Sequence, residues 1–325
     1  MSGSLWDHLK PRQQAIEAAL RSVIVRHAAD APPALTDAMS YSLLAPGKRL
    51  RPLLVVLACE AVGGDLGQAL PAGCAVEMVH TYSLIHDDLP AMDDDDLRRG
   101  LPTCHKKFGD ALAILAGDAL LTMAFEVLTT GYGPRTAAVS CAELAAGAGA
   151  VGMVGGQVLD LSAEQTGDRR QETGDRKAED GSTGSELPPA SCPLSPDSQL
   201  EAIHRRKTGA LFRSALRLGV FAALAEEGVH PDMLAAIDDY AAAFGLAFQV
   251  TDDLLDVESS ADKTGKRVGK DAARGKLTYP GLLGVDASRQ KAKDLVRDAI
   301  AAAGRLGPGA EPLAELARYV VERDR

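Results

Sequence analysis

Apolar residues recur every three or four positions through most of the chain, and this spacing restricts it to helical folds. Two stripes of this kind are clear, one formed by Leu5, Leu9, Ile16, Leu20, Val23 and Ile24 and one by Leu234, Ile237, Ala241, Phe244 and Phe248. The repeat is that of a helix that buries one face. Residues 111–128 are mostly apolar, which indicates a helix inside a core.

Signals for β-structure are scarce. Only short runs such as residues 53–57 are candidate strands, and no alternating pair of runs is joined by an Asn-Gly turn. With 325 residues, 46% of them hydrophobic, the chain can bury a sizeable core. We therefore expect an all-α fold in which residues 1–325 form a single domain, one large helical bundle.

Residues 163–197 depart from this pattern. They contain Thr-Gly-Asp-Arg at 166–169 and again at 173–176, followed by several glycines and prolines, and they lack aromatic residues, Val, Ile and Met. Such a stretch buries too little apolar surface to offset its ordering entropy. We expect a disordered surface insertion, with a regulatory or partner-binding loop as the alternative. A passive loop is tolerated because closure entropy grows slowly with length.

Charge and targeting features exclude several classes of protein. Lys and Arg total 35 against 45 Asp and Glu, a net charge of −10 without any basic run, so we expect no nucleic-acid partner. Because no stretch of about 18 uncharged apolar residues exists, we expect no transmembrane segment. Residues 1–10 do not resemble a secretory signal, and the five cysteines lack disulfide or metal spacing. These features favour a cytoplasmic protein.

The strongest chemical signal is the acidic run at 87–96, in which six of ten residues are Asp. Apolar residues surround it, and carboxylates held together beside a core need cations. Ligands that are all oxygen favour hard cations, Mg²⁺ above all. Pro90 biases Leu89 away from helical geometry. We therefore expect Asp87 near the C-terminus of a helix and Asp93 in the turn that follows.

A second acidic motif lies far along the chain. Asp252 and Asp256 are four residues apart and share a helix face, with Gln249 on the same side and Asp253 between them. Both acidic motifs are embedded in apolar helix. The two together indicate two walls of one cavity.

Basic residues form a matching set. Lys48 and Arg51 lie in a turn at 47–52, Arg98 and Arg99 follow the first acidic run, and three more basic positions are Lys207, Lys266 and Lys276. The polar Thr208 directly follows Lys207. Arg binds phosphate through a two-pronged fork and Lys through a point charge. Each alone is more often a surface charge, but together they predict diphosphate binding. His80, seven residues before Asp87 on the same helix face, is predicted to contact the ligand.

These motifs resemble those of the trans-isoprenyl diphosphate synthases, and of bacterial farnesyl diphosphate synthases in particular. The run from Asp87 to Asp93, with four residues between the Asp pair and the next Asp, is similar to the family's first aspartate-rich motif, and residues 252–256 to its second. Residues 47–52, His80, 155–157, 207–208 and 265–276 match in order and approximate spacing. The resemblance covers almost the whole chain outside 163–197. It implies helices around a deep central cavity, the isoprenoid synthase fold, usually in a homodimer.

The resemblance also implies an activity and a role for each matching residue. Isopentenyl diphosphate would be joined head to tail to dimethylallyl and geranyl diphosphate, by ionisation, condensation and elimination, to give farnesyl diphosphate. Up to three Mg²⁺ ions, with Mn²⁺ as a substitute, would be held by Asp87, Asp88, Asp93, Asp252, Asp253 and Asp256. Isopentenyl diphosphate would contact Lys48, Arg51, His80 and Arg99. The allylic diphosphate would contact Arg98, Lys207 and Lys266, with Lys276 nearby, and Thr208 and Gln249 would face the reacting carbons.

Product length is expected to depend on Tyr82 and Ser83, the fifth and fourth residues before Asp87. An aromatic ring at the fifth position resembles bacterial farnesyl synthases, whereas plant geranylgeranyl synthases have a smaller or more flexible residue there. The alternatives are a geranylgeranyl synthase, a class I terpene cyclase, a non-catalytic synthase subunit and an acidic cation-binding protein. The isopentenyl-binding residues argue against the cyclase, the retention of both acidic motifs against the inactive subunit, and the paired basic sites against simple cation binding.

Overall fold

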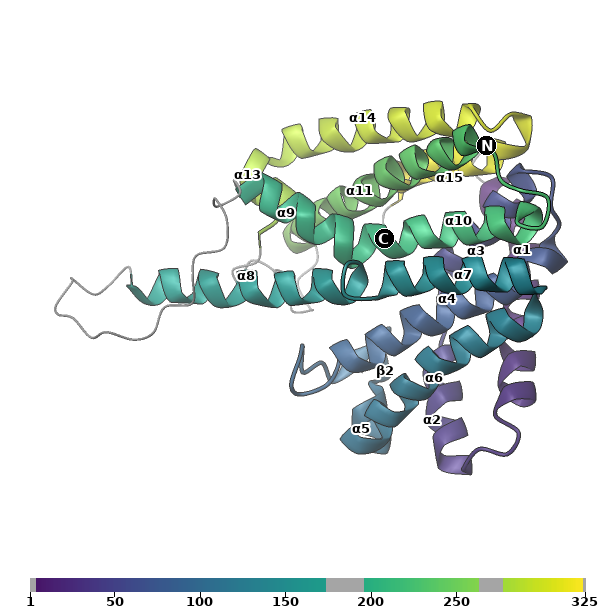
Figure 1. The fold of residues 1–325 in the computed structure, drawn as a ribbon. Helices are drawn as coiled ribbons and strands as arrows, with labels where there is room; N and C mark the ends of the chain where they lie inside the picture. Colours follow the sequence, from purple (N-terminus) through teal and green to yellow (C-terminus); the bar gives the residue numbers. More distant parts are fainter. Residues whose placement is uncertain (1–3, 174–195, 263–276, 324–325) are drawn as a thin grey trace, which may run out of the picture.

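The computed structural model describes residues 4–173, 196–262 and 277–323, and they are almost entirely helical (Figure 1). The helices of the first half are α1 (Ser4–His27), α2 (Pro33–Leu43), α3 (Leu50–Ala61), α4 (Leu66–Asp87), α5 (Cys104–Phe108), α6 (Asp110–Gly131), α7 (Pro134–Ala148) and α8 (Met153–Thr173). Those of the second half are α9 (Pro196–His204), η1 (Arg205–Gly209), α10 (Ala210–Leu224), α11 (Pro231–Asp262), α13 (Tyr279–Leu283), α14 (Val285–Gly304), η2 (Pro308–Ala310) and α15 (Glu311–Glu322). The expected all-α fold is confirmed.

Within the described ranges, β-structure is limited to two short strands, β1 (Leu97–Arg98) and β2 (Leu101–Pro102). They pair antiparallel, with Leu97 opposite Pro102. Residues 53–57, the candidate strand, lie instead inside α3. Apolar residues there are buried on every side of the helix, and such a run cannot be told from a buried strand by periodicity alone.

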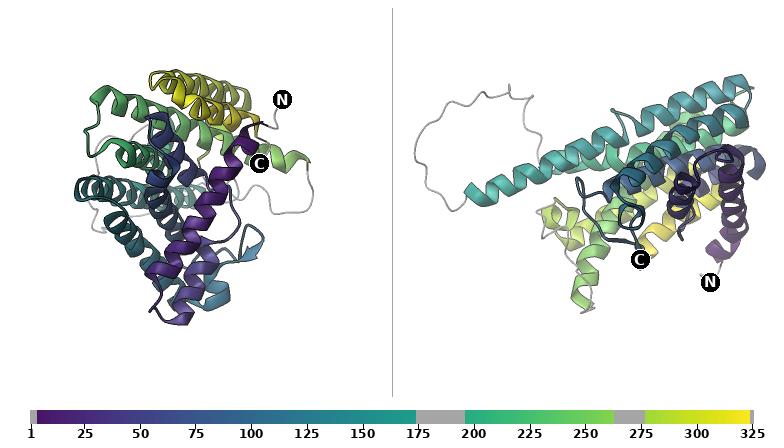
Figure 2. Two further views of the ribbon diagram at one scale, coloured as in Figure 1. Left: turned by 90° about the vertical axis from the view of Figure 1, so that its right-hand side faces the viewer. Right: turned by 90° about the horizontal axis from the view of Figure 1, so that it is seen from below.

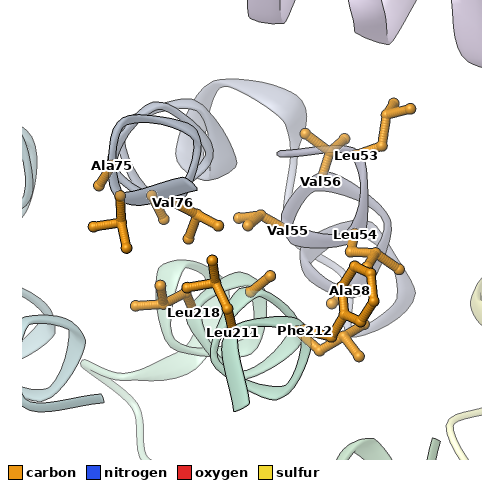
Figure 3. Packing of buried hydrophobic residues seen from close by; sticks show 14 of the residues in the cluster. Leu53, Leu54, Val55, Val56, Ala58, Ala75, Val76, Leu211, Phe212 and Leu218 are labelled. Atoms are coloured by element: carbon orange, nitrogen blue, oxygen red, sulfur yellow. The ribbon is translucent and has the colours of Figure 1, made fainter. Parts of the chain in front are cut away.

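The core is centred where α3, α4 and α10 meet. Side chains of α3 such as Val55, of α4 such as Val76 and of α10 such as Leu218 point into the shared space between the three helices (Figure 3). The approach of α10 to α3 is close, since a Cβ atom on Gly219 would lie 2.2 Å from the carbonyl oxygen of Val55. This packing fixes α3 and α4, whose ends carry the basic turn and the first acidic motif.

Helix α8 follows α7 almost end to end and extends past the neighbouring helices of the bundle (Figures 1 and 2). Residues 163–173 of the stretch expected to be a disordered insertion belong to this helix. Residues 174–195 lie outside the described residues. The passive-loop interpretation of that part stays a prediction.

Among the residues that the structure describes, three helical stretches are long and apolar enough, by length and composition, to cross a membrane, and one of them runs through α7 into α8. They are Asp110–Gly131, Pro134–Ala163 and Pro231–Val257, and 44% of the most apolar window of each is buried within the protein. The expectation of no transmembrane segment rested on wholly uncharged stretches, which is a stricter criterion than mean hydropathy. The expectation stays a prediction, because a bundle helix that is apolar on most sides has the same composition as a spanning helix.

Candidate active site

The first acidic motif folds back on the end of α4. The helix ends at Asp87, and the backbone N–H of Asp93 donates to the carbonyl of Asp87 at 2.8 Å. Asp94 adopts a left-handed backbone with φ +48°, which Asp tolerates better than most residues. The turn therefore brings Asp93 back to the helix end that carries Asp87, as Pro90 predicted.

The carboxylates of this motif repel one another. Burial raises the pKa of Asp87 to about 6; Lys207 opposes that rise, and Asp93 adds to it. Burial also raises the pKa of Asp88, against the effect of Arg98. A divalent cation between Asp87 and Asp93 would relieve both the burial and the repulsion.

Asp88 is already engaged by protein. Nε of Arg98 donates to its two carboxylate oxygens at 2.8 and 2.9 Å, and Nη2 donates to Oδ1 at 2.6 Å. Arg98 lies on the β1–β2 hairpin, and the Asp88 side chain is only 4% exposed. This fork ties the hairpin to the end of α4. The metal-binding role expected for Asp88 stays a prediction.

The second acidic motif lies on α11. The carboxylate of Asp252 accepts a hydrogen bond of 2.5 Å from Nη2 of Arg323, and burial raises the pKa of Asp252. Asp253 is buried and accepts from the backbone N–H of Tyr279 at 3.0 Å. Asp256 is exposed. Helical geometry therefore places Asp252 and Asp256 on one face and turns Asp253 toward α13.

A cavity of about 500 Å³ lies between the basic turn, α4, α11 and α15. Four predicted ligand-binding residues line it, namely Lys48, Arg51, His80 and Arg99. Apolar residues that include Phe244, Phe248 and Leu316 complete its lining. The structure thus brings the four predicted ligand-binding residues, of which Lys48 and Arg99 are 51 residues apart, to one cavity with apolar side chains from the second half of the chain.

This basic cavity has the electrostatics of an anion site. Burial lowers the pKa of Arg51 to about 10, and repulsion from Arg99 acts in the same direction. The guanidinium of Arg51 stacks on Phe212 at 4.9 Å, while its buried Nε has no hydrogen-bond partner in the described structure. Burial together with Arg51 and Arg99 holds the pKa of His80 well below its usual range. An anion would satisfy the Arg51 donor and reduce the repulsion.

The basic turn is held by residues that sequence reasoning missed. Arg49 has φ +52°, and its buried guanidinium donates to Glu17 at 2.5 Å and to Glu77 at 2.8 Å. Arg99 donates to the carbonyl of Pro46 at 2.8 Å. A signal for Glu77 existed, because it lies one helical turn before His80 on α4.

Lys207 and Thr208 lie on η1, a π-helical turn between α9 and α10. Nζ of Lys207 donates to Asp160 of α8 at 2.5 Å. The two helices touch, since a Cβ atom on Gly156 would lie 2.2 Å from the backbone nitrogen of Lys207. Asp160 was missed, although its place four residues after Gly156 puts it on the same face. π-Helical turns often occur at functional sites.

The number and type of oxygen ligands near Asp87 determine which metal ion the site suits. Among the described residues, no three His, Cys, Asp or Glu side chains are grouped closely enough to hold a metal ion. A site of one or two carboxylates per ion is nevertheless what Mg²⁺ uses when water and substrate phosphates complete its shell. Asp87 and Asp93 fit that requirement. The described residues do not form the all-protein oxygen cage that Ca²⁺ sites use. Lys266 and Lys276 lie outside the described residues.

Tyr82 and Ser83 lie on α4, above the first acidic motif. Tyr82 is 7% exposed, and its ring meets His86 edge to face at 5.7 Å. His86 in turn hydrogen-bonds the carbonyl of Ile114 on α6 at 3.1 Å. Ser83 donates to the carbonyl of His80 at 2.8 Å. Tyr82 is therefore buried on the face of α4 that also carries His86, whose imidazole contacts α6.

Comparison with known proteins gives one consistent family. The model of the polyprenyl synthetase family matches residues 32–305. The farnesyl diphosphate synthase of Escherichia coli is 44% identical over 298 residues, which are 90% of each chain, and that of Bacillus subtilis is 40% identical over the full length of both. Geranylgeranyl pyrophosphate synthase 9 of Arabidopsis thaliana, a chloroplast protein, is also 44% identical, over 90% of this chain and 75% of its own.

Solved structures agree with this result. A farnesyl/geranylfarnesyl diphosphate synthase from Zymomonas mobilis superposes with a TM-score of 0.78 at 35% identity, and the match covers 99% of this chain and all of that one. A geranyltransferase from Legionella pneumophila superposes with a TM-score of 0.77 at 30% identity.

Proposed function

Because the chain belongs to the polyprenyl synthetase family and is a prenyltransferase, we propose that its product is farnesyl diphosphate. The substrates would be those of the family, isopentenyl diphosphate and an allylic diphosphate. The observation that carries the proposal is the arrangement at the site. The basic cavity holds a buried Arg51 Nε without a hydrogen-bond partner in the described part of the chain, and Arg51 lies close enough to Asp252 of the second acidic motif to influence its pKa. In the first motif, burial and repulsion from Asp93 raise the pKa of Asp87, which a cation would relieve.

In this proposal the basic cavity holds isopentenyl diphosphate. Lys48, Arg51 and Arg99 donate to the diphosphate oxygens. His80, neutral because burial and four neighbouring arginines lower its pKa, adds a hydrogen bond without a charge. The apolar lining at Phe244 and Phe248 suits the five-carbon tail.

The allylic diphosphate would lie beside Asp87 and η1, where Lys207 and Arg98 bind its oxygens. Lys207 is close enough to Asp87 to lower the carboxylate's pKa, so the two face one site. Mg²⁺ on Asp87, Asp93 and Asp252 would stabilise the charge that develops on the leaving diphosphate. Oxygen atoms of Thr208 and Gln249 would face the allylic cation as dipoles. The condensation product then loses a proton, for which the departing diphosphate is the acceptor.

Farnesyl length is supported by Tyr82, a bulky ring buried on the face of α4 that also carries His86. A chain that grows from Asp87 along α4 would meet this ring. The observation favouring the second candidate, geranylgeranyl diphosphate, is the relative from Arabidopsis thaliana at the same identity as the bacterial farnesyl synthase.

A homodimer is the assembly we favour. Helices α6 and α8 expose large apolar side chains, including Leu115 at 56%, Val154 at 45% and Val158 at 57%. Exposed apolar side chains of this kind are typical of interfaces, and the homodimer implied by the family resemblance names a second copy as the occupant. A cytoplasmic location stays a proposal, since relatives include bacterial proteins and chloroplast proteins.

The test is a product assay. Purified protein is incubated with Mg²⁺, isopentenyl diphosphate and either dimethylallyl or geranyl diphosphate, and the dephosphorylated products are separated by chain length. A dominant C15 alcohol supports the proposal. A C20 alcohol keeps the reaction and rejects the role of Tyr82. Absence of condensation by folded protein favours a non-catalytic subunit.

A further inference from the structure

Arg323, the residue that follows α15, reaches across to the second acidic motif. Its Nη2 donates to Oδ1 of Asp252 at 2.5 Å and to the carbonyl of Phe248 at 3.0 Å. The guanidinium also stacks on the Phe248 ring at 3.9 Å. The Arg323 side chain is 7% exposed and the Asp252 side chain 42%. Arg323 thus places a buried cation on Asp252, a predicted metal ligand.

The contact between Arg323 and Asp252 is favourable, but it leaves one donor of the Arg323 guanidinium without a partner among the described residues. A charged hydrogen bond stabilises the pair. However, the buried Nε of Arg323 has no partner in the described structure, and an unsatisfied buried donor is costly. Burial raises the pKa of Asp252 even though Arg323 opposes that shift. Arg323 has extended backbone beyond the last turn of α15, so its release need not unfold a helix.

We propose that Arg323 acts as an internal cation, which occupies Asp252 while the site is empty and is displaced when a divalent metal binds there. The proposal rests on the function proposed above, because it takes Asp252 as a metal ligand. The guanidinium occupies Oδ1 of Asp252, and a divalent ion on the same carboxylate would lie within a few ångströms of that positive charge and be repelled by it. Metal binding at Asp252 is therefore weakened by the competing Arg323.

The displaced guanidinium has a defined place to act. Arg323 lines the same cavity as Lys48, Arg51 and Arg99, so loss of its Asp252 partner leaves one more uncompensated positive charge there. This increases the attraction of the cavity for an anion. Arg323 thereby couples metal entry at the second acidic motif to anion binding in the basic cavity, and the coupling is reciprocal.

The experiment measures binding of Mn²⁺ alone, by the electron paramagnetic resonance signal of the free ion, with no substrate present. Arg323→Gln should bind Mn²⁺ about fivefold more tightly than the unaltered protein, as expected for loss of a competing, partly exposed ion pair. Arg323→Lys, which keeps the charge, should lie between the two. In an Asp252→Asn background, Arg323→Gln should change nothing.

A thermal readout separates this role from a structural one. Arg323→Gln should have a lower melting temperature than the unaltered protein when no metal is present. In saturating Mn²⁺ the difference in melting temperature between the two proteins should be smaller, because the metal has already broken the Arg323–Asp252 pair. An equal loss with and without Mn²⁺ means that the pair is structural only. The matched control is Arg318→Gln, which removes an exposed α15 pair with Glu311 and should affect neither Mn²⁺ binding nor the metal dependence of stability.

Failure of this inference and failure of the proposed function give different results. Unchanged Mn²⁺ affinity in Arg323→Gln, in protein that still makes prenyl products, overturns the role of Arg323 alone. Tighter Mn²⁺ binding in protein that makes no prenyl product supports the displacement and rejects the activity.

Discussion

The ammonium group of Lys207 donates a hydrogen bond of 2.5 Å to the carboxylate of Asp160, and it also lies close enough to Asp87 to lower that carboxylate's pKa. The π-helical turn that carries Lys207 is therefore positioned from two sides. Asp160 on α8 orients the ammonium, and Asp87 at the end of α4 defines the site it faces. A diphosphate that binds here would contact a Lys207 ammonium group whose orientation is already fixed by Asp160.

This arrangement predicts that the two basic regions serve different substrates. Lys207→Met should raise KM for the allylic diphosphate by roughly 10-fold or more, because one charge-assisted hydrogen bond is lost. Arg51→Met should raise KM for isopentenyl diphosphate by a similar factor. Steady-state kinetics with each substrate varied in turn checks both. If the two variants raise the same KM, the division of the site is wrong.

Removing the ring of Tyr82 should lengthen the product. Tyr82→Ala opens space on this face of α4, so C20 alcohols should appear where C15 predominated. Tyr82→Phe is the matched control, because it keeps the ring and removes only the hydroxyl, and its product should stay C15. Chromatography of dephosphorylated products measures both. An unchanged product in Tyr82→Ala contradicts the proposed role of the ring.

The raised pKa of Asp87 predicts that this residue destabilises the metal-free fold. Its pKa is about 6 in the folded protein against an ordinary value of 3.8, so the unfolded chain holds fewer protons between these values. Stability should fall as pH rises from about 4 to about 6, and the loss persists above that. Asp87→Asn should therefore raise the free energy of unfolding by about 2 kcal/mol at pH 7.5.

The same substitution should have little effect on stability at pH 3.5, where both states bind the proton, and it should greatly reduce Mg²⁺-dependent prenyl transfer at pH 7.5. Denaturant unfolding in the presence of a chelator measures the first effect and the product assay the second. A variant that is less stable than the unaltered protein at pH 7.5 would contradict the assignment.

Gly156→Ala should disturb η1. A Cβ atom at this position would lie 2.2 Å from the backbone nitrogen of Lys207, and backbone cannot move aside as a side chain does. We expect a destabilisation of about 2 kcal/mol and a fall in kcat. Gly304→Ala is the control, because nothing lies within 4 Å of a Cβ atom there. Thermal unfolding and kinetics compare the two variants, and equal behaviour would remove the argument for close contact.

Leu115→Arg should dissociate the proposed dimer. Leu115 is exposed on α6, and a buried unpaired charge at an interface is strongly unfavourable. Sedimentation velocity should show a dimer of the 34.0 kDa chain for the unaltered protein and a monomer for the variant. Val25→Arg, at an exposed apolar position of α1, should leave the dimer intact. A monomeric unaltered protein would reject the interface.

Local helical structure was well predicted from the sequence. The apolar spacing predicts α1, α6 and α11, because burying one face of a helix imposes a period that is visible residue by residue. Pro90 predicts the end of α4 at Asp87, since proline restricts the residue before it. The spacing of Asp252 and Asp256 likewise follows from helical geometry alone.

The partners of the charged groups were decided only by the tertiary structure. Sequence patterns assign Asp88 and Asp253 to metal binding as readily as Asp87, yet the fold gives Asp88 to Arg98 and turns Asp253 to Tyr279. Those bonds depend on which face of a helix meets which neighbour.

What the sequence by itself determined is therefore the all-α class of the fold, several of its helices and the chemical character of the site, because these follow from residue types at short spacing. What the tertiary structure decided is which charged partner each of these carboxylates and cations contacts. Lys207 and Asp160 are 47 residues apart, and Arg323 and Asp252 are 71 apart. Only the packing of whole helices brings such groups within hydrogen-bond distance, and a hydrogen bond fails over a fraction of an ångström.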